Sequence, residues 1–234
     1  MTRYRALAGL LADALLGVLA PERVDAHGVT GKDAIFLQSV DGAAVGPLMY
    51  LGAKHMVTGY DHLLFLVGVI FFLYRLKDVL LYVSLFTLGH SLTLLAGAIG
   101  GVRANPYLID AVIGLSVVYK GFENVGGFKR LFGVAPDTRL AVVVFGLFHG
   151  LGLATKLQEF DLATNGLVAN IVSFNVGVEI GQMLALTFVL IALTYWRTRP
   201  GFLRHAFLTN TALMMGGFVL VGYQVAGYFM TAGV

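Results

Sequence analysis

Histidine and carboxylate side chains recur inside long apolar stretches of this sequence. His55, Asp61 and His62 open an apolar stretch that continues past residue 70, and three later stretches carry ionisable residues near their middle. An ionisable side chain inside a membrane helix costs roughly 2.5–3.5 kcal/mol and usually marks a function. Imidazole and carboxylate groups also bind divalent transition metals. The candidate metal ligands are His55, Asp61, His62, His90, His149 and Glu179.

A structural role is the alternative for each of these residues taken alone. A single histidine in a membrane helix can hydrogen-bond a neighbouring helix without any ligand. The whole set is harder to explain in this way, because four imidazoles and two carboxylates would all need partners within one bundle. One divalent metal ion would satisfy several of them together. The set therefore favours a metal site over hydrogen bonds between helices.

The spacing of His55 and His62 limits the geometry of such a site. The two histidines are seven residues apart, so an unbroken helix would place them on one face but about 10 Å apart along its axis. Metal–nitrogen bonds are about 2 Å long, so one ion cannot bind both in that arrangement. Either the two histidines serve two successive sites, or the helix is broken between them. Gly59 marks where a break would fall, and broken helices commonly build ion sites in transporters.

Uncharged polar residues accompany the candidate ligands at helical spacing. Asn175 and Gln182 lie about one turn to either side of Glu179, which makes a polar stripe along one helix face. In an earlier stretch, Thr87 lies about one turn before His90, and Ser91 directly follows it. We expect Asn175, Gln182, Ser91 and Thr87 to support the site by hydrogen bonding.

The composition identifies a membrane protein. Of the 234 residues, 58% are hydrophobic and only 12% are charged, and the mean hydropathy is +0.82, whereas soluble domains carry about 25% charged residues. Cysteine is absent, which excludes disulfides and thiolate metal sites. The net charge of +3 reflects basic loops and is no sign of nucleic-acid binding. The sequence also lacks the G-x-x-x-x-G-K-[ST] motif, so we expect no nucleotide partner.

The chain divides into three predicted parts. Residues 1–26 have a basic start and a short apolar run, which is typical of a signal peptide or a short N-terminal helix. Residues 27–47 are an exposed extracytoplasmic segment, and cleavage after residue 26 would make His27 a further candidate ligand. Residues 48–230 form an all-α, polytopic membrane bundle of six transmembrane helices, or seven if the leader is retained. The six spans are 48–74, 78–99, 106–124, 139–157, 166–196 and 203–230.

The distribution of lysine and arginine predicts the orientation. Basic residues concentrate in the loops around 74–78, 120–139 and 197–204 and are sparse in the alternate loops. Because cytoplasmic loops carry the excess of positive charge, these three loops are predicted to face the cytoplasm. The 27–47 segment and the C-terminus then lie on the extracytoplasmic side.

Five motifs follow one another between about residues 50 and 185: HMVTGYDHLLFL, FTLGHSLTL, IGLSVVYKGFEN, FGLFHGLGLA and FNVGVEIGQ. Their combination resembles the HupE/UreJ family of bacterial membrane proteins, which are regarded as nickel or cobalt permeases associated with hydrogenase and urease maturation. The resemblance implies a location in the inner membrane and metal-handling roles for His55, Asp61, His62 and His149. Nickel members often carry a second histidine soon after the Phe-His-Gly element, where this chain reads HGLGLA. The resemblance implies nickel or cobalt, and this departure leaves zinc, copper and iron open as well.

The sequence is compatible with three functions. The first is a permease for a divalent transition metal, driven passively or by the membrane potential or protons. The second is a metal-binding assembly factor or metallochaperone for a metalloenzyme. The third is an intramembrane zinc hydrolase in which Glu179 acts as general base. The predicted partners are the lipid bilayer and the metal ion, together with a second copy of the chain or a metalloenzyme under maturation.

Overall fold

The chain folds into helices joined by short turns. The computed structural model describes residues 36–37, 39–158 and 165–232, and no strand occurs among them. The predicted leader and His27 lie outside the described residues. In chain order the helices are α3 (Val45–Thr58), α4 (Tyr60–Ile70), α5 (Leu76–Gly100), α6 (Pro106–Asn124), α7 (Gly127–Phe132), α8 (Thr138–Leu157), α9 (Leu167–Arg197) and α10 (Phe202–Ala232).

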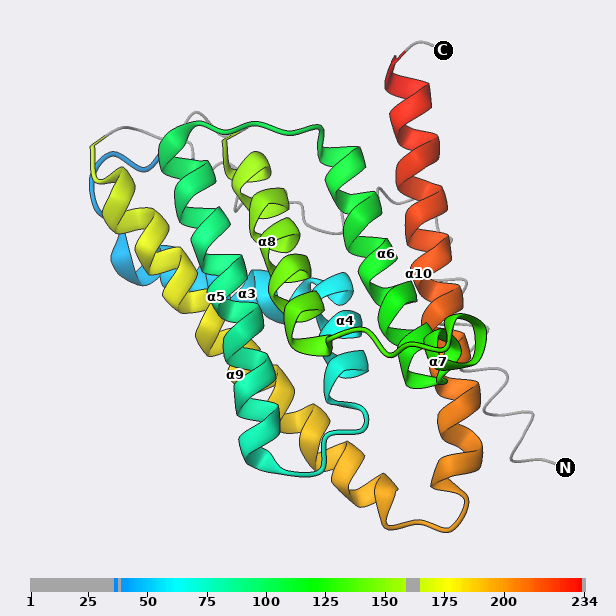
Figure 1. The fold of residues 1–234 in the computed structure, drawn as a ribbon. Coiled ribbons are helices and arrows are strands. Elements are labelled where there is room, and N and C mark those ends of the chain that lie inside the picture. Colours follow the sequence, from blue (N-terminus) through cyan, green and yellow to red (C-terminus); the bar gives the residue numbers. More distant parts are fainter. Residues whose placement is uncertain (1–35, 38, 159–164, 233–234) are drawn as a thin grey trace, which may run out of the picture.

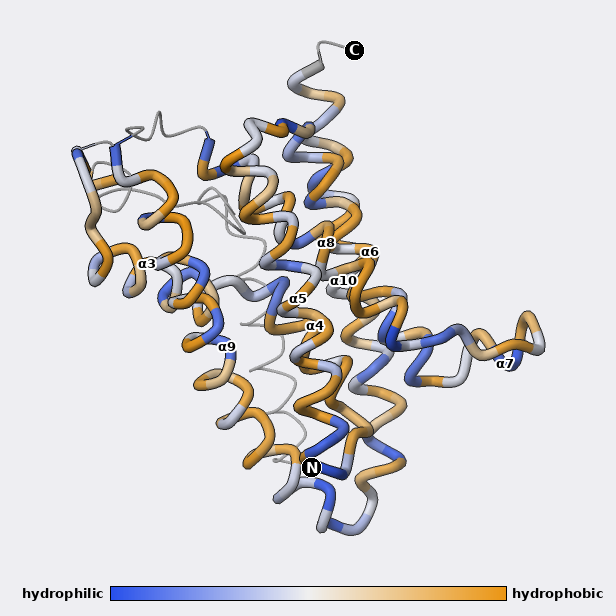
Figure 2. The backbone as a smooth tube through the Cα atoms, turned by 60° about the vertical axis from the view of Figure 1, so that its left-hand side comes forward, coloured by the Kyte–Doolittle hydropathy of each residue, from blue (hydrophilic) through white to orange (hydrophobic). Residues whose placement is uncertain are grey.

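Four helices among the described residues are long and apolar enough to cross a membrane: α5, α8, α9 and α10. Together with α6 they run in alternating directions along the bundle (Figure 1). Hydrophobic residues dominate along the helices, and hydrophilic residues gather at many of the turns (Figure 2). The predicted class, an all-helical membrane protein, is therefore confirmed. A count of six membrane spans stays a prediction.

Local sequence signals set several helix boundaries. Asn105 caps α6, because its side chain accepts a hydrogen bond from a backbone N–H of the first turn, and Pro106 takes the first helical position. Asp137 caps α8 by accepting from the Arg139 N–H at 2.8 Å. Gly101 ends α5 with a φ of 67°, a left-handed conformation that suits glycine. Each predicted span after the first coincides with one helix to within a few residues.

Glycines allow three pairs of helices to pack closely. α5 packs along α8, α3 along α9 and α6 along α10. A Cβ atom added at Gly150 of α8 would lie 2.0 Å from the His90 carbonyl oxygen on α5. One added at Gly177 of α9 would lie 1.9 Å from the Met49 carbonyl oxygen on α3. The backbones touch at these positions, and small residues are what allow such contact between membrane helices.

The first predicted span, 48–74, is not one continuous helix. α3 and α4 divide it at Gly59, which has a non-helical conformation (φ −75°, ψ 87°). The Gly59 N–H donates to the His55 carbonyl oxygen at 2.8 Å, and the Gly59 carbonyl oxygen accepts from the Leu63 N–H at 3.2 Å, so α3 ends and α4 begins at this residue. Of the two arrangements expected for His55 and His62, the structure has the broken helix.

Arg197, at the end of α9, holds the end of the short helix α4. Its guanidinium donates to the carbonyl oxygens of Ile70 (2.6 Å), Phe71 (2.7 Å) and Leu73 (3.0 Å). It also lies over the Tyr74 ring, 4.7 Å from the ring centroid. The last carbonyl groups of a helix have no partner within their own helix, and this cation satisfies them. α4 therefore begins at the break at Gly59, and Arg197 holds its C-terminal end.

The turns after α4 and α9 lie at one end of the bundle, and the ends of α5 and α10 lie at the other (Figure 1). The end with the turns after α4 and α9 carries the basic loops around 74–78 and 197–204, so we expect this end to face the cytoplasm. In right-side-out vesicles, a membrane-impermeant thiol reagent should label Thr231→Cys directly and Arg130→Cys only after the membrane is opened. The parent chain has no cysteine and serves as the unlabelled control. Labelling of both variants from the same side would contradict this topology.

Candidate metal centre

Four histidine rings meet inside the bundle, and each comes from a different helix. His55 lies on α3, His62 on α4, His90 on α5 and His149 on α8. The His62 ring centroid lies 4.7 Å from that of His149, 5.5 Å from that of His55 and 5.6 Å from that of His90. All four side chains are buried. The structure therefore brings these four predicted ligands together around His62, and we call them the histidine cluster.

Asp61 lies against the cluster in the first turn of α4. Its Oδ1 accepts a hydrogen bond from the His62 backbone N–H at 2.9 Å and lies 3.1 Å from His62 Nδ1. The carboxyl group also interacts electrostatically with His149 and His55. A carboxylate bonded to a ligand imidazole fixes its tautomer and raises its basicity. With Nδ1 engaged by Asp61, Nε2 is the His62 nitrogen that would bind a metal.

The tautomer of His149 follows from its own hydrogen bond. His149 Nδ1 lies 2.8 Å from the Phe145 carbonyl oxygen, which can only accept. The proton is therefore on Nδ1, and Nε2 carries the lone pair. The Nε2 atoms of His149 and His90 are buried and have no hydrogen-bond partner in the described part of the chain. Such buried nitrogens are costly unless something binds them, and a metal ion would do so.

The distance between the His62 and His149 rings suits two imidazoles that share one ion. With a metal–nitrogen bond of about 2.0–2.1 Å, the centroids of two imidazoles on the same ion lie about 4.5–5.2 Å apart. The spacing between His62 and His149, 4.7 Å, lies in this range, whereas the spacings from His62 to His55 (5.5 Å) and to His90 (5.6 Å) are slightly longer. As the side chains stand, no three His, Asp or Glu side chains of the described residues are oriented to hold one ion. Binding of one ion by three of the rings would require His55 or His90 to move closer to His62.

Aromatic side chains enclose the cluster. Phe86 lies 5.1 Å from His149 and 6.0 Å from His90 between ring centroids, and Phe65 lies 5.4 Å from His149. Both phenylalanines are fully buried, so they keep water from the imidazoles and lower the local dielectric constant. Neither was predicted from the sequence, although Phe86 lies four residues before His90 and Phe65 three residues after His62. Those spacings place each ring on the face of its helix that carries the histidine.

The supporting polar residues pair with one another between α5 and α9. Asn175 donates to the Ser91 hydroxyl at 2.9 Å, and Gln182 donates to the Thr87 hydroxyl at 3.0 Å. Glu179 lies between the two amides on α9, is partly buried, and makes no hydrogen bond or ion pair with the residues that the structure describes. Its carboxylate is thus not joined to the histidine cluster in the way that Asp61 is.

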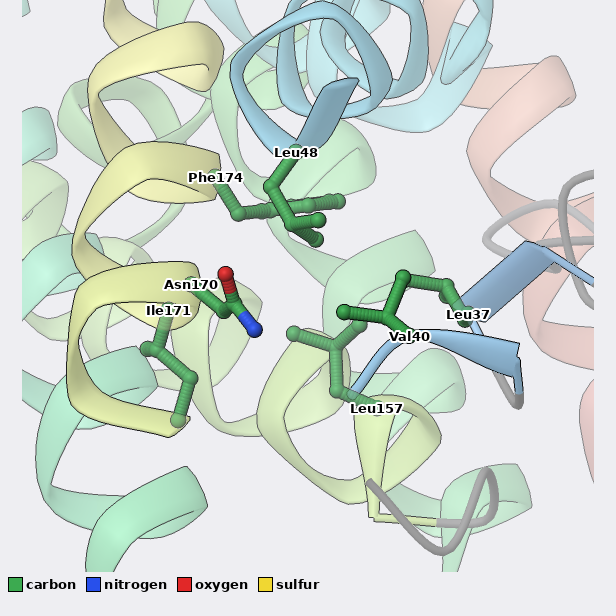
Figure 3. A pocket seen from close by; sticks show the side chains of 7 residues that line it. All are labelled: Leu37, Val40, Leu48, Leu157, Asn170, Ile171 and Phe174. Atoms are coloured by element: carbon green, nitrogen blue, oxygen red, sulfur yellow. The ribbon is translucent and has the colours of Figure 1, made fainter. Parts of the chain in front are cut away.

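A small apolar pocket lies between the first turns of α9, the end of α8 and the segment that precedes α3 (Figure 3). Asn170 is its polar lining residue, and its amide holds the preceding segment through Gly42 (2.9 Å) and Ala44 (2.8 Å). Phe174 lines the pocket and lies 6.0 Å from the His55 ring between centroids. This ring therefore contacts both the pocket and the histidine cluster. The lining residues are Leu37, Val40, Leu48, Leu157, Asn170, Ile171 and Phe174.

The helices and the buried histidines together define an all-helical membrane protein with a candidate metal centre inside its bundle. Residues 31–232 match the family model described as HupE / UreJ protein, and the chain belongs to this family. No curated protein and no solved structure matches the chain significantly.

Proposed function

We propose that this protein is a permease that carries a divalent transition metal ion across the bacterial inner membrane. The observation that supports this most directly is the meeting of four buried histidines, from α3, α4, α5 and α8, at the point where the first membrane segment is broken. A broken helix at a polar site is a common feature of transporters, because it lets an ion reach ligands in the middle of the bundle. An ion arriving there could exchange water for imidazole one ligand at a time.

Nickel or cobalt is the cargo that we propose, on the strength of family membership. Imidazole nitrogen also suits zinc, copper and iron, so ligand chemistry alone does not select among them. The histidine that nickel-type members carry soon after the Phe-His-Gly element is replaced here by leucine and glycine. This departure leaves one nitrogen ligand fewer than in such members, although four imidazoles still surround the site.

An accessory role in metalloenzyme maturation is the second candidate, and family membership favours it as well. Both functions use the same ligands, so they differ in whether the ion crosses the membrane. The sequence carries no nucleotide-binding motif, and we propose that an inward-negative membrane potential drives the ion inward. The C-terminus would then lie on the side from which the ion arrives.

Uptake into proteoliposomes tests this proposal. Purified protein should first be analysed for bound metal and then reconstituted with an imposed potential and offered Ni²⁺, Co²⁺, Zn²⁺, Cu²⁺ or Fe²⁺. We expect Ni²⁺ or Co²⁺ to enter well above the rate in protein-free liposomes. Tight binding without uptake would support the accessory role instead. Neither binding nor uptake of any of the five metals would contradict both.

A further inference from the structure

A buried ion pair lies on the side of the histidine cluster where α6 begins and α8 ends. Lys156 Nζ on α8 is 2.8 Å from Asp110 Oδ2 on α6, and the two side chains are only 14% and 6% exposed. Gln224 on α10 donates to the same carboxylate oxygen at 3.4 Å. A buried ion pair contributes little net stability compared with well-packed apolar residues. The pair therefore suggests a purpose other than holding three helices together.

Lys156 is placed to act on the cluster. It follows His149 by seven residues on α8, so it lies on the same helix face about 10 Å along the axis. The electrostatic partners of His55, Asp61 and His62 all include this lysine. The ammonium group thus adds a positive charge to the field in which a metal cation would bind.

We propose that Asp110 and Lys156 form a counter-charge that sets how tightly the histidine cluster holds a metal ion. Lys156 pairs with Asp110 at 2.8 Å, so the carboxylate offsets part of the positive charge that the lysine brings near the cluster. The charge of Lys156 opposes the binding of a cation in the cluster, and the charge of Asp110 reduces this opposition. The two side chains together thus set the affinity of the cluster. The inference rests on the proposed metal-binding function.

Coulomb's law gives the sign of each substitution. Lys156→Gln removes a positive charge, so the cluster should bind a divalent cation more tightly. Asp110→Asn leaves the charge of Lys156 uncompensated, so binding should weaken. At about 10 Å and an effective dielectric constant of about 20, one unit charge changes divalent binding on the order of a hundredfold, and side-chain relaxation leaves about tenfold. The double variant should bind like the parent, because the two changes in charge cancel.

The experiment is a calorimetric titration of the purified full-length protein with Ni²⁺ and Co²⁺, accompanied by thermal unfolding without metal. We expect the Kd to fall about tenfold in Lys156→Gln, to rise about tenfold in Asp110→Asn and to return to the parent value in the double variant. Dissociation into excess chelator should be correspondingly slower in Lys156→Gln. Lys156→Arg keeps the charge and should keep the Kd within about twofold. Its comparison with Lys156→Gln separates the loss of charge from the loss of the side chain, even if Asp110→Asn does not fold.

Lys120→Gln is the matched control. Lys120 pairs with Glu123 at 2.9 Å with comparable burial (8% and 18% exposed), at the opposite end of α6. Its loss should leave the Kd unchanged, whatever it does to thermal stability. If both single variants shift the Kd in the same direction, or neither shifts it, the counter-charge is refuted while metal binding stands. A parent protein that binds no metal would refute the proposed function and this inference with it.

Discussion

Replacing His62 with alanine should abolish metal uptake while the protein still inserts into the membrane and purifies. His62 is the ring that joins the cluster, with the other three centroids 4.7–5.6 Å away. Removing it leaves no imidazole at the centre of the site. Loss of a partner that only orients a ligand typically costs about 10–100-fold in metal affinity, so loss of a ligand should cost more. The initial rate of Ni²⁺ or Co²⁺ uptake in proteoliposomes measures the effect, and His149→Ala should behave in the same way.

Three further variants separate a metal site from a structural cluster. His62→Gln keeps a polar side chain that can bond a neighbouring helix, yet it should also stop uptake. Asp61→Asn should lose about 10–100-fold in affinity if Asp61 only orients His62, and as much as His62→Ala if it binds the metal directly. His205→Ala, at the exposed start of α10, should be nearly silent.

The competing explanation is that the histidines only cross-link helices. It predicts that the His62 and His149 variants lose thermal stability in step with uptake, and that His62→Gln restores both. Well-folded His62→Ala and His149→Ala proteins that move metal at the parent rate would end the transport proposal.

The sequence predicted the parts of this structure that depend on depth along a helix. Hydrophobic runs located the helices after the first span, because a membrane helix must be apolar over its whole length. The ionisable residues of the three later stretches were located near the middle of those stretches. A break at Gly59 was one of the two arrangements left open for His55 and His62, because a straight helix cannot place both on one ion. These predictions needed only the position of a residue along its helix and the axial distance between His55 and His62.

The rotation of each helix about its axis could not be predicted in the same way. Glu179 has the right depth, but Gly177 and Gly181, two residues to either side, face α3 and pack against the carbonyl oxygens of Met49 and Ala53. Residues two apart lie about 200° apart around a helix, so Glu179 points away from α3 and from His55. Contacts between helices fix this rotation. The same limit explains why the proximity of Lys156 to Asp110 was not predicted, since it depends on how α6 and α8 face each other.

The packing of α5 against α8 predicts a second large effect, from the substitution Gly150→Ala. The added Cβ would lie 2.0 Å from the His90 carbonyl oxygen and 2.4 Å from Thr93 Oγ1. The nearer of these is a backbone atom and cannot rotate away, so the two helices must separate. We expect a loss of about 3 kcal/mol or more in the free energy of unfolding, and a fall of roughly 6–12 °C in the midpoint of thermal unfolding.

Uptake should fail in Gly150→Ala even in the fraction that stays folded, because separating α5 from α8 moves His90 and His149 away from His62. Gly222→Ala on α10 is the control, since no described atom lies within 4 Å of its added Cβ. Alanine is favoured over glycine within a helix by about 1 kcal/mol, so this variant should be as stable as the parent or slightly more stable, with normal uptake. Thermal unfolding in detergent and uptake in proteoliposomes measure both properties. A Gly150→Ala protein that matched Gly222→Ala in both would show that α5 and α8 do not touch at this position, and the histidine cluster built on their contact would have to be abandoned.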